Sequence, residues 1–176
     1  VANFICWGQS RPKWKRTIRT AEWLTANLPA DSSLQLYTFN TESSPAVADL
    51  KNTWVKISDK KNINRILAAL KQTIPQGGTS LYNAFAAAAR MKPRPDNILL
   101  LTDGLPTQGE KKSSKNTISG DERLKLFHQA TGVLPRAVPI NTILFPMEGD
   151  PMAAVSFWKL AIETGGSFLT PTRDWP

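Results

Sequence analysis

The side chains that most often carry out catalysis are scarce in this sequence. It contains one cysteine, Cys6, and one histidine, His128. Two such residues cannot build a zinc cluster, and a lone histidine without a nucleophile-elbow motif excludes a Ser–His–Asp triad. Cys6 precedes Trp7 at the end of a predicted strand, where we expect a buried and unreactive thiol. We expect His128 to be a surface or core histidine with no catalytic role.

A hydrolase mechanism at Asp103 is disfavoured by the residues around it. Asp103 directly follows the apolar run 97–102. Phosphoryl-transfer enzymes of similar topology end their first strand in a nucleophilic Asp, and this chain has Cys6-Trp7 there. Gly77-Gly78 lacks the Gly-Lys-Ser/Thr ending of a phosphate-binding P-loop. The sequence therefore favours a binding protein over an enzyme.

Positive charge is the feature that most suggests a binding role. Lys and Arg number 22 against 14 Asp and Glu, which gives a net charge of +8 and a pI near 9.8. This balance suits an acidic protein, an anionic membrane surface or a nucleic acid. Five cations lie close to predicted strand ends: Arg11, Lys13, Lys111, Lys112 and Lys115. We hypothesise that they attract an acidic group of a partner protein. The alternative, that they are solvated surface charges, stays open.

Length and composition indicate one folded domain. The chain has 176 residues, of which 41% are hydrophobic and 20% charged, and this excludes disordered, collagen-like and coiled-coil proteins. No apolar stretch approaches the roughly 20 residues of a membrane-spanning helix. The chain begins at Val1 without Met. We therefore expect a single domain over residues 1–176 that belongs to a longer protein, with a lean to a membrane-tethered or extracytoplasmic bacterial protein.

Strand-like and helix-like segments alternate along the chain. The apolar runs predict strands over 1–7, 34–39, 54–57, 97–102, 139–145 and 167–169. Helical spacing predicts helices over 13–28, 62–73, 81–91, 121–131 and 151–164, and loops over 40–53 and 103–120. This order predicts an α/β fold with a doubly wound, mostly parallel sheet flanked by helices. Ligands of such sheets bind at the carboxyl ends of the strands, so the loops to inspect are 6–13, 75–80, 103–115 and 145–151.

Four aromatic residues on two of the predicted helices allow a test of helix orientation. Trp14 and Trp23 are nine positions apart, which places them on opposite sides of one helix and leaves at least one for an exposed contact. We expect Phe157 and Trp158 to belong together to the core side of the last helix.

Two motifs in the predicted loops resemble those of a known family. Residues 77–81 read Gly-Gly-Thr-Ser-Leu, and residues 101–104 read Leu-Thr-Asp-Gly, about 24 positions later. With Phe39-Asn40 and the segment 164–166 (Thr-Gly-Gly), they resemble the von Willebrand factor type A (VWA) domain over essentially the whole chain. The resemblance implies a Rossmann-like fold and a non-enzymatic module for protein recognition or assembly.

The same resemblance implies a metal site, from which this chain departs. The family binds Mg²⁺ at a metal-ion-dependent adhesion site (MIDAS), with ligands from an Asp-x-Ser-x-Ser loop, a Thr and an Asp. Ser10, Thr79 and Asp103 match these positions. Cys6 replaces the first Asp, Gly8 replaces the first Ser, and a soft thiol suits Mg²⁺ poorly. We therefore expect Mg²⁺, the one cofactor implied, to bind weakly or not at all.

A basic nucleic-acid-binding domain is the alternative function. The run Arg-Pro-Lys-Trp-Lys-Arg at residues 11–16 and the positive net charge motivate it. The chain lacks the series of aromatic residues on which single-strand binders stack bases. A protein partner is therefore favoured over a nucleic acid.

Overall fold

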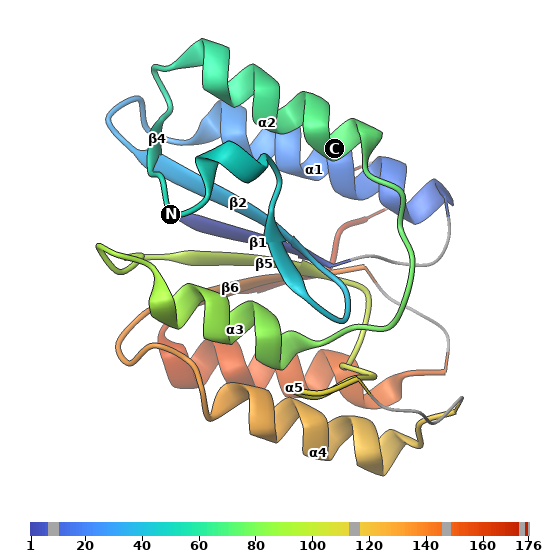
Figure 1. Ribbon diagram of the computed structural model, residues 1–176. Helices are drawn as coiled ribbons and strands as arrows, with labels where there is room; N and C mark the ends of the chain where they lie inside the picture. The colour runs from blue at the N-terminus through green and yellow to red at the C-terminus, as the bar shows by residue number, and fades with distance from the viewer. Residues whose placement is uncertain (7–10, 113–116, 146–148, 173–174, 176) are drawn as a thin grey trace.

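The alternating segments of the sequence fold into three layers, a sheet between two layers of helices (Figure 1). This computed structural model describes residues 1–6, 11–112, 117–145, 149–172 and 175, with the backbone alone at 2–4, 6, 11 and 12. The strands are β1 (Ala2–Cys6), β2 (Ser33–Phe39), β3 (Ser43–Pro45), β4 (Val55–Lys56), β5 (Ile98–Thr102), β6 (Ile140–Leu144) and β7 (Phe168–Leu169). The helices are α1 (Arg11–Asn27), α2 (Lys60–Gln72), α3 (Leu81–Arg90), α4 (Gly120–Thr131) and α5 (Pro151–Thr164).

The sheet has the strand order β3-β2-β1-β5-β6-β7, and β4 pairs with β2 outside this path. Strands β1, β2, β5, β6 and β7 run parallel, whereas β3 and β4 pair antiparallel with β2. The chain moves from the centre to one edge and then to the other, so the order reverses between β1 and β5. The predicted α/β fold with a doubly wound, mostly parallel sheet is confirmed.

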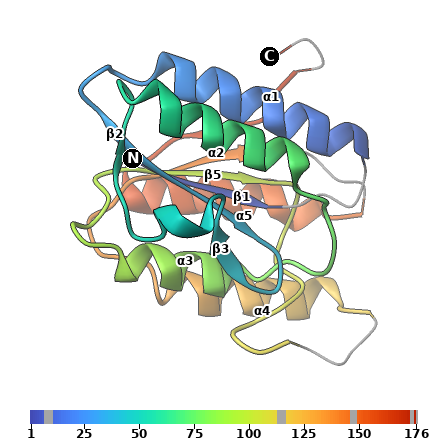
Figure 2. The ribbon, with the colours of Figure 1, turned by 45° about the horizontal axis from the view of Figure 1, so that its top comes forward.

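Each face of the sheet carries its own hydrophobic core. Helices α1 and α2 cover one face and α3, α4 and α5 the other (Figure 2). Neighbouring residues of β5 divide between these cores, because successive side chains of a strand point to opposite faces. Leu100 is 0% exposed on the α3 side and Leu101 is 1% exposed on the α1 side. Each such leucine stabilises the fold by about 1.5–3 kcal/mol.

The predicted loop 40–53 contains structure that the sequence did not indicate. Residues Ser43–Pro45 form β3, and Ala48–Leu50 form a 3₁₀ turn. Ser-Ser-Pro has little intrinsic strand preference. It becomes a strand because the chain folds back along β2, where Ser44 pairs with Thr38.

One prediction for the tryptophans is confirmed and another is wrong. Trp14 is 6% exposed and Trp23 43% exposed, which confirms that they lie on different sides of α1. The placement of Phe157 in the core is also confirmed. The placement of Trp158 beside it is wrong, because its side chain is 56% exposed. Consecutive helical residues are rotated by about 100°, so Phe157 and Trp158 cannot both face the sheet.

Two glycines after α5 return the chain to the sheet. Gly165 has a φ of +72°, the left-handed conformation that ends many helices. A Cβ at Gly166 would overlap the carbonyl oxygen of Ile140. These positions require glycine, which explains the Thr-Gly-Gly segment before β7.

Candidate functional site

The carboxyl ends of the parallel strands, on the right in Figure 1, bring together the loops that the sequence analysis selected. We call loop 75–80, loop 103–112, Lys13 and Asp150 the rim. Open α/β sheets bind ligands at this edge, beside the point where the strand order reverses. Here that point lies between β1 and β5.

Hydrogen bonds join the two motif loops of the rim. The backbone N–H groups of Thr107 and Gln108 both donate to the carbonyl oxygen of Thr79, at 2.9 Å each. The N–H of Thr79 donates to Oγ1 of Thr107 at 2.9 Å. The hydroxyl of Ser80 donates to the carbonyl oxygen of Gly109 at 2.6 Å. The segments containing Thr79 and Asp103 are therefore held as one unit, although they are far apart in sequence.

The end of β2 is tied to the same unit. The N–H of Ser80 donates to the carbonyl oxygen of Asn40 at 2.6 Å. Asn83, in the first turn of α3, donates through Nδ2 to the carbonyl oxygen of Thr41 at 2.7 Å. Ser80 also caps α3, because its hydroxyl accepts from the N–H of Asn83 at 3.2 Å.

The glycine pair in the first motif permits this close approach. A Cβ at Gly78 would lie 2.7 Å from Cγ of Gln108 and 2.9 Å from Oγ1 of Thr107. Gly77 has a φ of +87°, which side chains other than glycine rarely tolerate. The Gly-Gly dipeptide thus lets loop 75–80 pack against loop 103–112.

Asp103 lies half-buried in the rim, near charges of both signs. Burial is the main influence and raises the pKa of its carboxyl above the ordinary value. The positive charges of Lys13 and Arg123 lower this pKa, and the negative charge of Asp150 raises it. The carboxylate that the resemblance assigns to a metal therefore already has two cations of its own chain nearby.

An ion pair behind Asp103 was not predicted from the sequence. Nη2 of Arg123 lies 2.7 Å from Oδ2 of Asp150, and the two side chains are only 11% and 4% exposed. The same carboxylate oxygen accepts from the N–H of Leu105 at 2.7 Å, and Nη2 of Arg123 also donates to the carbonyl oxygen of Leu105. This pair fixes loop 103–112 to the start of α5. The one available signal was Asp150 before Pro151, an acidic residue at a predicted helix start.

The structure describes only some of the predicted partner-binding and metal residues. Lys13 is half-buried, while Lys111 and Lys112 are exposed. Arg11 is the first residue of α1, and its side chain is outside the described part. Ser10, Gly8 and Lys115 lie outside the described residues, as does the side chain of Cys6 at the end of β1. Thr79 and Asp103 are the predicted metal ligands that the structure places in adjoining loops.

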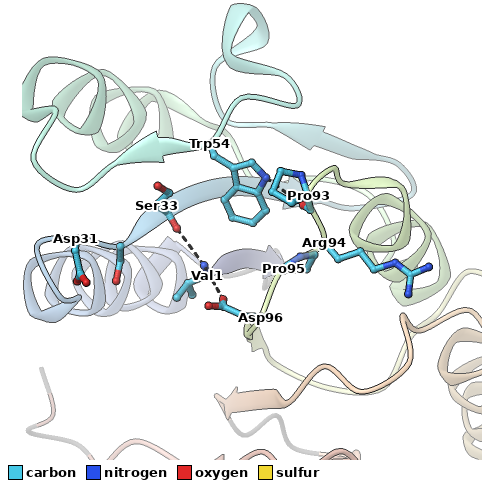
Figure 3. Close-up of a pocket in the computed structure, with 9 residues that line it drawn as sticks. Val1, Asp31, Ser33, Trp54, Pro93, Arg94, Pro95 and Asp96 are labelled. Atoms are coloured by element: carbon cyan, nitrogen blue, oxygen red, sulfur yellow. Dashed lines mark hydrogen bonds and ion pairs between the residues drawn. The ribbon is translucent and has the colours of Figure 1, made fainter.

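A hollow of about 490 Å³ lies at the opposite end of the sheet (Figure 3). Nε1 of Trp54 donates to the carbonyl oxygen of Pro93 at 3.2 Å, and the amine of Val1 lies 3.3 Å from Oδ1 of Asp96. This hollow is at the amino ends of the strands. The candidate site is therefore the rim, where sheets of this kind bind ligands.

Comparison with known proteins identifies the fold. No protein-family model matches the sequence, and no curated protein matches it either. A von Willebrand factor type A structure from Catenulispora acidiphila matches with a TM-score of 0.67 and 13% identity. The match covers 97% of this chain and 38% of that one. The fold is VWA-like.

Two further solved structures share this VWA-like fold. An aerotolerance-related membrane protein from Bacteroides fragilis has a TM-score of 0.57 and 13% identity, over 98% of this chain and 92% of that one. Proximal thread matrix protein 1 from the mussel byssus, with a zinc-occupied MIDAS motif, has a TM-score of 0.59 and 12% identity. That match covers 97% of this chain and 43% of the mussel protein. Similarity at this level of identity shows the fold alone.

None of the helices in the described ranges combines the length and hydropathy needed to cross a bilayer. Within the same ranges, no group of three or more His, Cys, Asp or Glu side chains is placed to hold a metal ion.

Proposed function

We propose that this chain is a non-enzymatic recognition or assembly module that binds a protein partner through the rim. VWA-like domains typically serve adhesion and protein binding. The observation that carries the proposal is the hydrogen-bonded unit of loop 75–80 and loop 103–112 at the ligand-binding edge of the sheet. A surface held in this way loses little conformational entropy when a partner binds.

The partner's acidic groups would be attracted by the cations of the rim. The predicted set is Arg11, Lys13, Lys111, Lys112 and Lys115. Lys111 and Lys112 are exposed, so their ammonium groups are available to a partner. Such charges raise association rates and weaken with salt, which gives the proposal a measurable signature.

The donor set of the rim fits Mg²⁺ poorly, and we infer that the metal site is weakened or lost. Mg²⁺ needs hard oxygen ligands and is attracted by negative charge. Asp103 has the cations Lys13 and Arg123 nearby, and Asp150 is already engaged by Arg123. Cys6 stands where the family has an Asp. A residual cation would contact Ser10, Thr79 and Asp103.

Titration with Mg²⁺ and Mn²⁺ tests the metal inference. Calorimetry and thermal melting are compared between the native chain and Asp103→Ala. We expect no saturable heat and no shift in melting temperature up to millimolar metal. A saturable shift that disappears in Asp103→Ala would show a working site and would contradict this part of the proposal.

Partner capture from an extract of the source cells tests the recognition role. The immobilised chain is compared with Lys111→Glu/Lys112→Glu and with Lys60→Glu/Lys61→Glu, a matched reversal of two exposed cations on α2. We expect the native chain to capture a partner protein even in the presence of chelator. The α2 variant should capture the same protein, and the rim variant should not. Equal binding to all three proteins would refute a rim-directed role.

A further inference from the structure

The positive charge of the chain is concentrated on one helical layer. Helices α1 and α2 together hold nine Lys and Arg against one acidic residue, Glu22. Five of these cations lie in the first nine residues of α1, which has no acidic residue in its first turn: Arg11, Lys13, Lys15, Arg16 and Arg19. The N-terminus of a helix carries partial positive charge, so cations there disfavour the helix. The helix dipole therefore does not account for Arg11 and Lys13 in the first turn, whereas Arg16 is used within the fold, where it contacts Phe145 and Trp175.

Three exposed side chains form a line along the outer face of α1. Lys15, Arg19 and Trp23 follow one another at intervals of four residues, which places them on one side of the helix. Each step advances about 6 Å along the helix axis. We call these three residues the α1 row. It begins beyond the rim and runs away from it.

The cations of the α1 row differ in their partners from Arg65 and Lys71, two of the four cations of α2. On α2, Arg65 lies 2.8 Å from Asp49, and Lys71 lies 2.6 Å from Glu22. Within the described part of the chain, no carboxylate pairs with Lys15 or Arg19. Binding an acidic group at the α1 row therefore breaks no ion pair of the described residues.

Trp23 gives the α1 row an aromatic end that is held in place. Its side chain is 43% exposed, and its ring meets that of Trp175 edge-to-face, with centroids 5.2 Å apart. Nη2 of Arg16 donates to the carbonyl oxygen of Trp175 at 3.3 Å, which ties Trp175 to α1. A half-exposed indole supported in this way is the kind of anchor on which interfaces depend.

We propose that the α1 row binds an extended peptide that carries acidic residues at two alternate positions and an apolar residue at the next. Alternate side chains of an extended chain are about 6.8 Å apart on one face. This spacing is close to the 6 Å step of the row. The two carboxylates would meet Lys15 and Arg19, and the apolar side chain would pack on Trp23.

The charge beside Trp23 decides between this peptide and other polyanions. Glu22 directly precedes Trp23, and its carboxylate is paired with Lys71. A nucleic acid carries a phosphate at every unit and an anionic membrane presents charge over its whole plane, so either would set negative charge against Glu22. A peptide in which the acidic residues stop before the apolar one avoids this repulsion.

Fluorescence anisotropy with a labelled peptide tests the inference. The probe is Gly-Glu-Ser-Glu-Ser-Phe-Gly, and its control is Gly-Glu-Glu-Ser-Ser-Phe-Gly, of identical composition. We expect the alternating peptide to bind at least threefold more tightly. Lys15→Glu/Arg19→Glu should weaken it about tenfold or more, and Trp23→Ala about fivefold. Both variants change exposed residues, and thermal melting confirms that they are folded.

Two matched variants separate the α1 row from net charge and from the rim. Lys60→Glu/Lys61→Glu makes the same charge change on α2, and Lys111→Glu/Lys112→Glu makes it on the rim. We expect each to change peptide affinity less than twofold, so failure of the rim proposal would leave this result intact. Equal losses in all three double variants would overturn the inference, as would equal affinity for both peptides. Tighter binding of an oligothymidylate or of phosphatidylserine vesicles, with loss in the row variant, would also overturn it.

Discussion

Helices α1 and α5 both begin at the rim, but the charges at the two helix starts are opposite. Asp150 stands at the N-cap of α5, where a carboxylate agrees with the helix dipole, and Arg123 neutralises it in a buried pair. α1 instead carries Arg11 and Lys13 in its first turn. The charge at the start of α5 thus agrees with the helix dipole, whereas the charges in the first turn of α1 oppose it. Such a difference points to binding as the reason for the charges of α1.

The outer faces of the two helices differ just as strongly. The face of α1 that points away from the sheet carries Lys15 and Arg19. α5 exposes four large apolar side chains, namely Met152, Val155, Trp158 and Ile162, at 43%, 55%, 56% and 61%. Because α5 also buries Phe157 and Leu160 against the sheet, it is apolar on both sides. The fold requires only the inner face of each helix, so the outer faces are free to differ.

The largest expected effect is a difference in stability between substitutions on the inner and outer faces of α5. Phe157 is fully buried and meets Phe127 edge-to-face at 5.2 Å. Phe157→Ala should lower the free energy of unfolding by about 3–5 kcal/mol, because it removes buried contacts and leaves a cavity. Trp158→Ala should cost less than about 1 kcal/mol. Urea unfolding of both variants measures the difference, and equal losses would show that the outer face of α5 is not free.

The next effect compares Arg123, which pairs with Asp150 at the start of α5, with Arg16 of α1. Arg123→Met should cost about 3 kcal/mol, because it leaves Asp150 buried without its counter-charge. Adding Asp150→Asn should restore part of this loss, since the neutral amide oxygen still accepts from the N–H of Leu105. Arg16→Met, which removes a partly exposed arginine from α1, should cost less than about 1 kcal/mol. Urea unfolding checks all three variants, and no recovery in the double variant would argue against a charge effect.

Local sequence patterns were sufficient for the parts of the fold that depend on near neighbours. The apolar run before Asp103 and the helical spacing of α2 predicted their elements because burial imposes a period along the chain. The Gly-Gly dipeptide predicted a turn, and the structure adds that Gly78 also allows contact with Thr107. The motif loops could therefore be found from the sequence alone.

The features that were missed depend on partners distant in sequence. β3 exists because Ser43–Pro45 pairs with β2, not because of its own residues. Arg123 and Asp150 are 27 positions apart and follow no period, so their pairing required the three-dimensional structure. Trp158 was misplaced because adjacency to Phe157 was weighed above helical rotation. A tertiary contact decided the first two of these outcomes, and the rotation between consecutive helical residues decided the third.

A smaller effect concerns the half-buried carboxylate between the starts of the two helices. Burial raises the pKa of Asp103 in the folded state above its ordinary value of 3.8. The protonated carboxyl therefore stabilises the folded state, and this contribution is fully present below pH 3.8. That contribution is lost as pH rises through the folded pKa. Asp103→Asn should therefore have a higher melting temperature than the native chain at pH 7. The shift should be about 2–4 °C for each kcal/mol gained in the free energy of unfolding.

At pH 3 the carboxyl is protonated in both states, and Asp103→Asn should melt within a degree of the native chain. Chelator in both buffers removes any contribution from metal. A higher melting temperature for the native chain at pH 7 would mean that Lys13 and Arg123 outweigh burial. It would then be the cations that dominate this part of the rim.

The smallest effect tests whether the cations of α1 oppose its dipole. Arg11 is the first residue of α1, so Arg11→Glu should raise the free energy of unfolding by about 0.3–1 kcal/mol at low ionic strength. The gain should shrink at about 0.5 M salt, because exposed charges are screened. Arg19→Glu lies two turns further along and should gain less, since the dipole acts mainly on the first turn. Urea unfolding at both salt concentrations measures these changes. A loss of stability in Arg11→Glu would mean that folding itself favours the cations, and the contrast with α5 would then no longer indicate binding.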